Sequence, residues 1–291
     1  MTLLVFAGLF VPIMVFGLSV YFFRMSNKNL KLLVAFSGAF LLSLTFNELI
    51  PQIYSGLDSQ PAVEEQIHSG GHLHNHDHSH DHHAEHGHQE DAGHGHNHGA
   101  AGKIGLFILL GFFIQLVLDY LTKGVEHGHL HSQCPDNHGH EHEPHSAAVS
   151  FIPVLIGLSL HSFLEGMPLA KGFESSALQN HLLLGIVIHN IPIAIVFMSL
   201  LIQNHLSRLM SILLLTVFAL SGPAGALAGN ILGTHFITDM QMFFKFSMAI
   251  VVGIFLHIST TILFESDQNH RFNLIKFAVI VLGALAALLH F

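Results

Sequence analysis

Long apolar runs constrain the fold of this chain more than any other feature. A helix needs about 20 apolar residues to cross a bilayer. The runs of that length are residues 2–23, 32–54, 104–122, 148–170, 181–203, 208–230, 242–264 and 272–291. Only helices and closed barrels satisfy the backbone in hydrocarbon, and the runs lack the alternation of barrel strands. The sequence predicts an all-α integral membrane protein with eight transmembrane helices in a single transmembrane domain, 1–291.

The composition agrees with a membrane protein and excludes several other classes. Only 10% of the 291 residues are charged, whereas soluble domains carry about 25%. The chain has 10 Lys and Arg residues, too dispersed to form a basic patch, so we expect no nucleic-acid partner. Cys134 is the single cysteine, which excludes an intrachain disulfide. The first run has no basic n-region and no cleavage site, so we interpret it as a span.

The basic residues predict the orientation, because cytoplasmic loops are enriched in Lys and Arg. One set of alternate loops and adjoining span ends carries Arg24, Lys28, Lys31, Lys123, Arg208, Arg271 and Lys276. The other set carries Lys103, Lys171 and Lys245. This asymmetry predicts that both termini are extracytoplasmic, and a short chain of this type suits a bacterial inner membrane.

Two segments are rich in histidine. Residues 68–98 contain thirteen His and residues 127–145 contain seven more. Neither segment can form an apolar core, so we predict a disordered extracytoplasmic loop (55–102) and a cytoplasmic loop (123–147). Neutral imidazoles bind zinc, nickel and copper, which favours metal scavenging over a merely flexible linker. The scavenging candidates in the first loop are His72, His74, His76, His78, His80, His82, His83, His94, His96 and His98.

Metal-ligand side chains also lie inside the spans. His161 and Glu165 are four positions apart, which puts them on one face of the fourth helix. His161 lies nine residues from the predicted outer end of its span, and His189 lies eight residues from the start of the fifth. At about 1.5 Å per residue these depths match.

Ionisable groups at that depth are costly and mark functional sites. Two His and one carboxylate form a Zn²⁺ ligand set with an open fourth position. Interhelical hydrogen bonds without a metal are the alternative.

Each of these two segments contains a proline, Pro168 and Pro192. A proline inside a helix leaves the carbonyl four residues earlier without its partner, here those of Leu164 and Ile188. Broken helices of this kind coordinate ions at mid-membrane in transporters.

Further polar residues predict a path to and from the site. Asn47 and Glu48 lie near the outer end of the second span and are candidates for an access funnel. His257 lies in the inner half of the seventh span and is a candidate for an exit. Packing is the alternative explanation for these residues.

The segments His161-Ser-x-x-Glu165-Gly and His189-Asn-x-Pro192 resemble the fourth- and fifth-helix signature of the ZIP (Zrt/Irt-like) metal transporters. The segments Ser221-Gly-Pro223-Ala-Gly-Ala and Phe255-Leu-His257-Ile-Ser extend the resemblance. It implies uptake of a divalent metal, usually Zn²⁺, into the cytoplasm, and no catalytic cofactor. It also implies two inverted three-helix repeats (spans 1–3 and 6–8) flanking central helices 4 and 5. A homodimer and an elevator-like movement of one bundle against the other are further implications.

Two positions depart from the pattern of many family members. Ile193 and Gly222 stand where relatives carry further ligands for a second, bridged metal. We therefore expect one transported metal, held by His161, Glu165 and His189. Ser162 and Asn190 are predicted as weak ligands or as partners of the ligands. Imidazoles favour zinc, but Fe²⁺, Mn²⁺, Ni²⁺ and Cd²⁺ remain open.

Two other functions are compatible with metal ligands in a membrane. A cation-diffusion exporter typically has six spans, which disagrees with eight. An intramembrane zinc hydrolase normally shows His-Glu-x-x-His, and that string is absent from the sequence.

Overall fold

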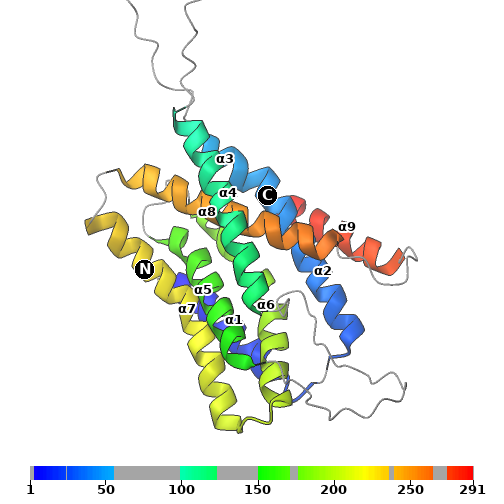
Figure 1. The fold of residues 1–291 in the computed structure, drawn as a ribbon. Helices are drawn as coiled ribbons and strands as arrows, with labels where there is room; N and C mark the ends of the chain where they lie inside the picture. Colours follow the sequence, from blue (N-terminus) through cyan, green and yellow to red (C-terminus); the bar gives the residue numbers. More distant parts are fainter. Residues whose placement is uncertain are drawn as a thin grey trace, which may run out of the picture.

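All regular secondary structure in the described residues of the computed structural model is helical. The described residues are 3–23, 25–55, 99–122, 150–170, 176–235, 239–264 and 274–290. The helices are α1 (Leu3–Ser19), α2 (Asn27–Leu44), the π-helical η1 (Thr45–Leu49), α3 (Ile50–Tyr54), α4 (Gly99–Thr122), α5 (Phe151–Gly166), the 3-10 turn η3 (Met167–Leu169), α6 (Ser176–Gln203), α7 (Arg208–His235), α8 (Met240–Phe264) and α9 (Leu274–His290). Figure 1 shows their arrangement.

Every predicted span coincides with a helix, but the helices differ in length. Within the described residues, six helices are long and apolar enough to cross a membrane, and one of them is the continuous run Asn27–Tyr54 through α2, η1 and α3. The apolar helices Leu3–Ser19 and Leu274–Leu289 are shorter. At 17 residues, α1 extends only about 25 Å. The fold is therefore a helical membrane protein with at least these six candidate spans.

Several helices extend beyond the predicted spans. Helix α4 begins at Gly99 and not at 104, so the last residues of the predicted 55–102 loop are helical. Helix α6 begins at Ser176 and not at 181, and α7 continues through Pro223 to His235. The apolar criterion stops at the first polar residue, whereas a helix continues wherever its backbone hydrogen bonds do. The hydropathy pattern therefore locates the helices better than it locates their ends.

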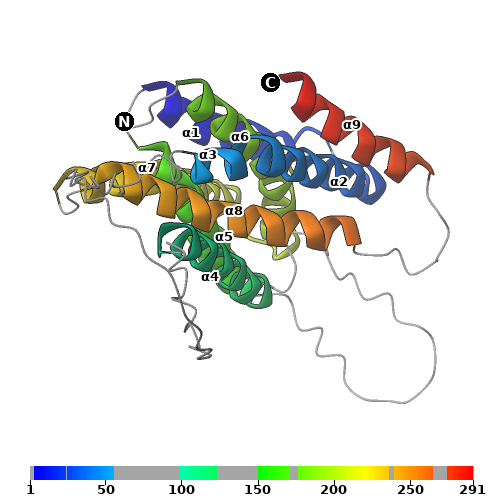
Figure 2. The same cartoon turned by 90° about the horizontal axis from the view of Figure 1, so that it is seen from above.

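The helices pack in two groups. In the first bundle, α5 packs against α7, and α1 packs against both α6 and α7. In the second bundle, α4 packs against α8, and α2 packs against α8 and α9, with α3 alongside α8. Figure 2 shows α8 lying between α4 and α2. The main contacts between the bundles are α2 with α6 and α4 with α5.

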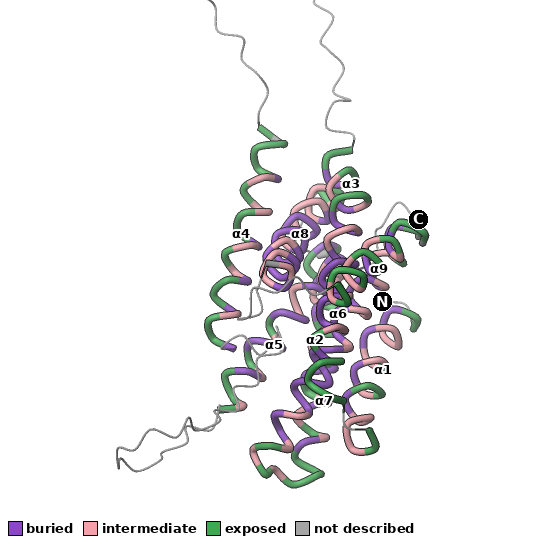
Figure 3. Tube along the Cα trace, turned by 90° about the vertical axis from the view of Figure 1, so that its right-hand side faces the viewer, coloured by how far each residue is buried: buried purple, intermediate pink, exposed green. Residues whose placement is uncertain are grey.

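Burial distinguishes the central helices from the peripheral ones. In the most apolar window of each helix, 72% of residues are buried in α6 and 67% in α8, against 22% in α4. Figure 3 shows this difference along the traces of α8 and α4. Most of the large exposed side chains of α4 are apolar, among them Leu106, Phe113 and Val117. An apolar surface of this kind suits contact with lipid chains.

Backbone-to-backbone packing fixes one helix pair in each bundle. A Cβ atom at Gly225 of α7 would overlap the carbonyl of Phe163 in α5. A Cβ atom at Gly253 of α8 would likewise overlap the carbonyl of Ile108 in α4. Small residues at such crossings let two helices approach closely and pack firmly. The α5–α7 and α4–α8 pairs are therefore the most tightly constrained crossings in the described structure.

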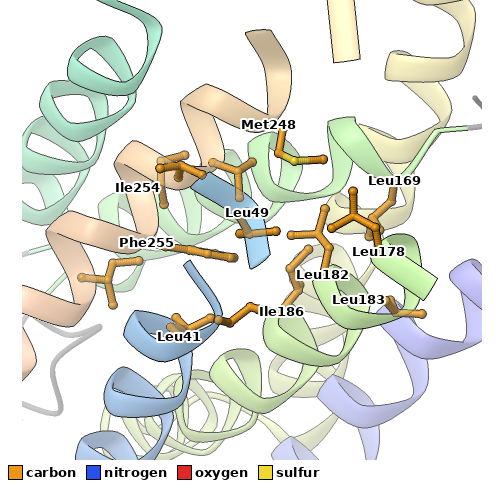
Figure 4. Close-up of a cluster of buried hydrophobic side chains, with 14 of the residues drawn as sticks. Leu41, Leu49, Leu169, Leu178, Leu182, Leu183, Ile186, Met248, Ile254 and Phe255 are labelled. Carbon is orange, nitrogen blue, oxygen red and sulfur yellow. The ribbon is translucent and has the colours of Figure 1, made fainter. Parts of the chain in front are cut away.

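The buried apolar side chains form two clusters with a polar layer between them. The first cluster contains the residues labelled in Figure 4, including Leu178, Leu182 and Ile186 of α6. The second cluster contains α6 residues from Ile193 to Leu201. Helix α6 thus passes from one cluster to the other. The residues between the two clusters carry the polar groups described next.

Candidate metal site

Helices α5 and α6 bring His161, Glu165 and His189 together in the layer between the two apolar clusters. Each side chain offers one ligand atom, and these atoms all lie within 4.8 Å of one another. The His161 Nε2 atom is 3.0 Å from Glu165 Oε1, and the two imidazole centroids are 5.6 Å apart. All three residues are at most 1% exposed. The predicted meeting of these three residues is therefore present in the structure.

The depth count behind that prediction started at residue 181, the first residue of the predicted span, whereas helix α6 begins earlier. His189 lies thirteen residues after Ser176, the first residue of α6, and eight residues after position 181, where the predicted span begins. The five additional residues of α6 precede the predicted span, so they leave the count within that span unchanged. The positions relative to the apolar clusters, and not the distance from the helix end, bring His161 and His189 to one level.

The two prolines have different effects. Pro168 lies in the 3-10 turn η3, and the carbonyl of Leu164 accepts a hydrogen bond from the Met167 N–H. The prediction that Pro168 leaves this carbonyl free is therefore wrong, because the chain tightens into an i→i+3 pattern. Pro192 lies inside α6, where it has no N–H to donate to Ile188.

Asn190 and Ser162 border the three central residues. Asn190 Nδ2 donates a long hydrogen bond of 3.5 Å to Glu165 Oε2, so the two carboxylate oxygens face different partners. Ser162 is 1% exposed, and within the described residues its Oγ has no hydrogen-bond partner. A Cβ atom at Gly222 of α7 would lie 3.0 Å from that Oγ. The absence of a side chain at Gly222 thus leaves room beside Ser162.

Gln115 of α4 is a contact that the sequence interpretation missed. Its Oε1 lies 2.9 Å from His161 Nδ1, and Gln115 is fully buried. The signal in the sequence was an amide side chain in the middle of an apolar run, between Lys103 and Asp119. Buried polar groups need hydrogen-bond partners, so such a residue indicates a partner on another helix.

A second histidine–carboxylate contact lies at the junction of η1 and α6. His181 Nδ1 is 3.8 Å from Glu48 Oε2, and the side chains are 18% and 30% exposed. The sequence interpretation had assigned no role to His181. Asn47 does not join this pair, because its Nδ2 donates to the Ser43 carbonyl at 2.8 Å. Of the two predicted access residues, Glu48 therefore contacts His181, two turns before His189, whereas Asn47 bonds within its own helix.

His257 lies on α8 and is not part of the group of three. Its ring makes an edge contact with Phe112 of α4 at a centroid distance of 4.9 Å, and the residue is 4% exposed. Its carbonyl accepts a hydrogen bond from the Thr261 hydroxyl. The predicted scavenging histidines, from His72 to His98, lie outside the described residues.

Two imidazoles and one carboxylate form a ligand set typical of zinc sites with an open position. In the part of the chain that the structure describes, this is the group of His, Cys, Asp and Glu residues with the geometry to hold a metal ion. The fold and this group together define a helical membrane protein with metal-ligand side chains in its core.

Comparison with known families specifies the class further. Residues 60–290 match a family described as ZIP zinc transporter. This match covers most of the 291 residues, and the chain belongs to that family. No curated protein matches the chain. Members of this family are metal transporters and not enzymes, so the hydrolase and the cation-diffusion exporter are both set aside.

Proposed function

We propose that the protein takes up Zn²⁺ across the membrane into the cytoplasm, with His161, Glu165 and His189 as the ligands of the transported ion. The observation that carries this proposal is the convergence of three ligand atoms within 4.8 Å. Burying a carboxylate beside two imidazoles is costly unless a proton or a cation offsets it. A divalent metal ion supplies that compensation.

The incomplete ligand set suits transport better than storage. Three protein ligands leave one tetrahedral position open for water or for the next ligand along the path. The neighbouring positions Ile193 and Gly222 add no charged ligand, which supports a single bound ion. The ions Fe²⁺, Mn²⁺, Ni²⁺ and Cd²⁺ accept the same nitrogen and oxygen donors. A competition assay therefore determines which metal the site prefers.

The half-buried Glu48–His181 pair is the proposed access point for the metal. Both side chains are partly exposed, and His181 is on the helix that carries His189. Eight residues separate the two histidines, which corresponds to about 12 Å along the α6 axis. We assign His257 to the opposite, exit side of the path, since it lies in the inner half of the predicted seventh span.

The helix pairing supports the inverted repeats implied by the family. Helix α1 packs on α6 as α7 packs on α5, and α2 packs on α9 as α8 packs on α4. This correspondence is expected when spans 1–3 and 6–8 are related by a twofold axis that exchanges spans 4 and 5. We propose eight spans, extracytoplasmic termini in a bacterial inner membrane, and a homodimer. In this scheme the first bundle carries the metal past the second.

Radiolabelled zinc uptake into vesicles of known protein orientation tests the proposal. We expect accumulation from the extracytoplasmic side, competition by other divalent metals according to preference, and loss of uptake in His161→Ala and His189→Ala. Protein in the membrane is measured in parallel. Unchanged uptake in both variants contradicts the site, and transport only toward the extracytoplasmic side contradicts the direction.

A further inference from the structure

A buried hydrogen bond connects the proposed metal ligand His161 to the other bundle. His161 Nδ1 and Gln115 Oε1 are 2.9 Å apart, and both residues are 0% exposed. Gln115 lies on α4 and His161 on α5, one of the main contacts between the bundles. The bond therefore joins two helices that belong to different groups.

The chemistry of this bond determines which imidazole nitrogen is available. The carbonyl oxygen of an amide only accepts hydrogen bonds, so His161 Nδ1 carries the proton and donates it to Gln115. The other ring nitrogen, Nε2, is the atom that lies 3.0 Å from Glu165 Oε1. In a neutral imidazole with a proton on Nδ1, Nε2 presents a lone pair. That lone pair is directed to the place where a metal shared with Glu165 has to bind.

We propose that Gln115 is a positioning residue, which fixes the tautomer and ring orientation of His161 so that Nε2 binds the transported metal. Metal-binding histidines commonly donate their second ring N–H to a carbonyl or carboxylate, and loss of that partner weakens metal affinity about 10–100-fold. Gln115 touches the ligand and not the metal. Its effect is on how well the ligand is oriented.

The position of Gln115 has a mechanical consequence. Since the amide belongs to the second bundle, His161 keeps this orientation only while α4 and α5 keep their present alignment. A displacement of one bundle along the other separates Oε1 from Nδ1. The affinity of the site is then highest in the arrangement described, and it falls when the bundles shift.

Three variants separate this role from packing. Gln115→Leu removes the acceptor and puts an apolar side chain of broadly similar volume in its place. Gln115→Glu restores an acceptor oxygen at the same reach. The packing control is Thr122→Val, because Thr122 is buried at the same α4–α5 contact, where its methyl group packs against Gly157. Thr122 has no hydrogen bond to His161; its hydroxyl donates to the Asp119 carbonyl.

The measurements are zinc uptake kinetics in vesicles and equilibrium dialysis of radiolabelled zinc against purified full-length protein. For Gln115→Leu we expect the half-saturating zinc concentration and the dissociation constant to rise about 10–100-fold, with the maximal rate largely kept. We expect Gln115→Glu to bind zinc at least as tightly as the wild type. We expect Thr122→Val to behave as the wild type in both measurements.

This inference rests on the proposed function, and His161→Ala separates their failures. Loss of zinc binding in His161→Ala together with wild-type behaviour of Gln115→Leu overturns the role of Gln115 alone. Wild-type binding and uptake in His161→Ala overturn the proposed site itself. Equal losses in Gln115→Leu and Gln115→Glu, or in Gln115→Leu and Thr122→Val, show a packing effect and also overturn the positioning role.

Discussion

The structure contains two histidine–carboxylate contacts of the same chemistry in different surroundings. His161 and Glu165 are 3.0 Å apart and fully buried, whereas His181 and Glu48 are 3.8 Å apart and partly exposed. Water screens the exposed pair, and such pairs are worth about 0–1 kcal/mol. The buried contact has no such screening, and a buried carboxylate is costly unless a proton or a cation offsets its charge. Burial therefore makes the loss of a side chain more costly at the inner contact than at the outer contact.

The backbone that carries each contact also differs between the two sites. The inner pair lies on α5, which is held against α7 by the close contact of Gly225 with Phe163. Glu48 lies on η1, where the Ile50 N–H bonds to the Thr45 carbonyl in an i→i+5 pattern. Such π-helical turns are rare and frequently occur at functional sites. A firmly packed helix pair supports the binding site, and a locally irregular helix carries the proposed access point.

The strongest test of this contrast makes the same change in both contacts. We expect Glu165→Gln to reduce zinc uptake at least 100-fold, because a buried ligand and its charge are lost together. We expect Glu48→Gln to raise the half-saturating zinc concentration only about twofold to fivefold, as fits a contact worth about 0–1 kcal/mol. Uptake kinetics are compared at equal amounts of protein in the membrane. Effects of equal size would contradict the proposed difference between the two contacts.

The firm packing of α5 against α7 is tested next. We expect Gly225→Ala to lower the stability of the detergent-solubilised protein by about 1–3 kcal/mol, because the new methyl group overlaps the Phe163 carbonyl. Gly102→Ala is the matched control, since a Cβ atom there meets nothing within 4 Å. Thermal unfolding of both variants is the measurement. A Gly225→Ala protein as stable as Gly102→Ala would show that the α5–α7 contact adjusts easily.

The smallest effect is expected from the histidine-rich segment, which precedes both contacts on the proposed path. Deletion of residues 68–98 should raise the zinc concentration needed for half-maximal uptake, with the maximal rate largely kept. The reason is that scavenging increases local metal supply without changing the binding site. Loss of transport at every zinc concentration would contradict a scavenging role.

Much of the helical framework was predictable, because membrane spans obey one strong rule. A backbone in hydrocarbon must form its own hydrogen bonds, so each apolar run became a helix. Helix ends were less predictable, as Gly99 and Ser176 show. Polar residues end an apolar run but do not end a helix, and no composition rule marks that difference.

The sequence by itself determined the alignment of His161 with Glu165, because a spacing of four places two side chains on one helical face. It also indicated His189, since few other ionisable residues lie so deep in an apolar run. Only the tertiary structure decided that Gln115 meets His161 and that Glu48 meets His181, residues 46 and 133 positions apart in the chain. Contacts within a helix follow from its periodicity. Contacts between helices depend on how each helix is rotated and shifted against its neighbours, and close packing such as that of Gly225 on the Phe163 backbone sets both.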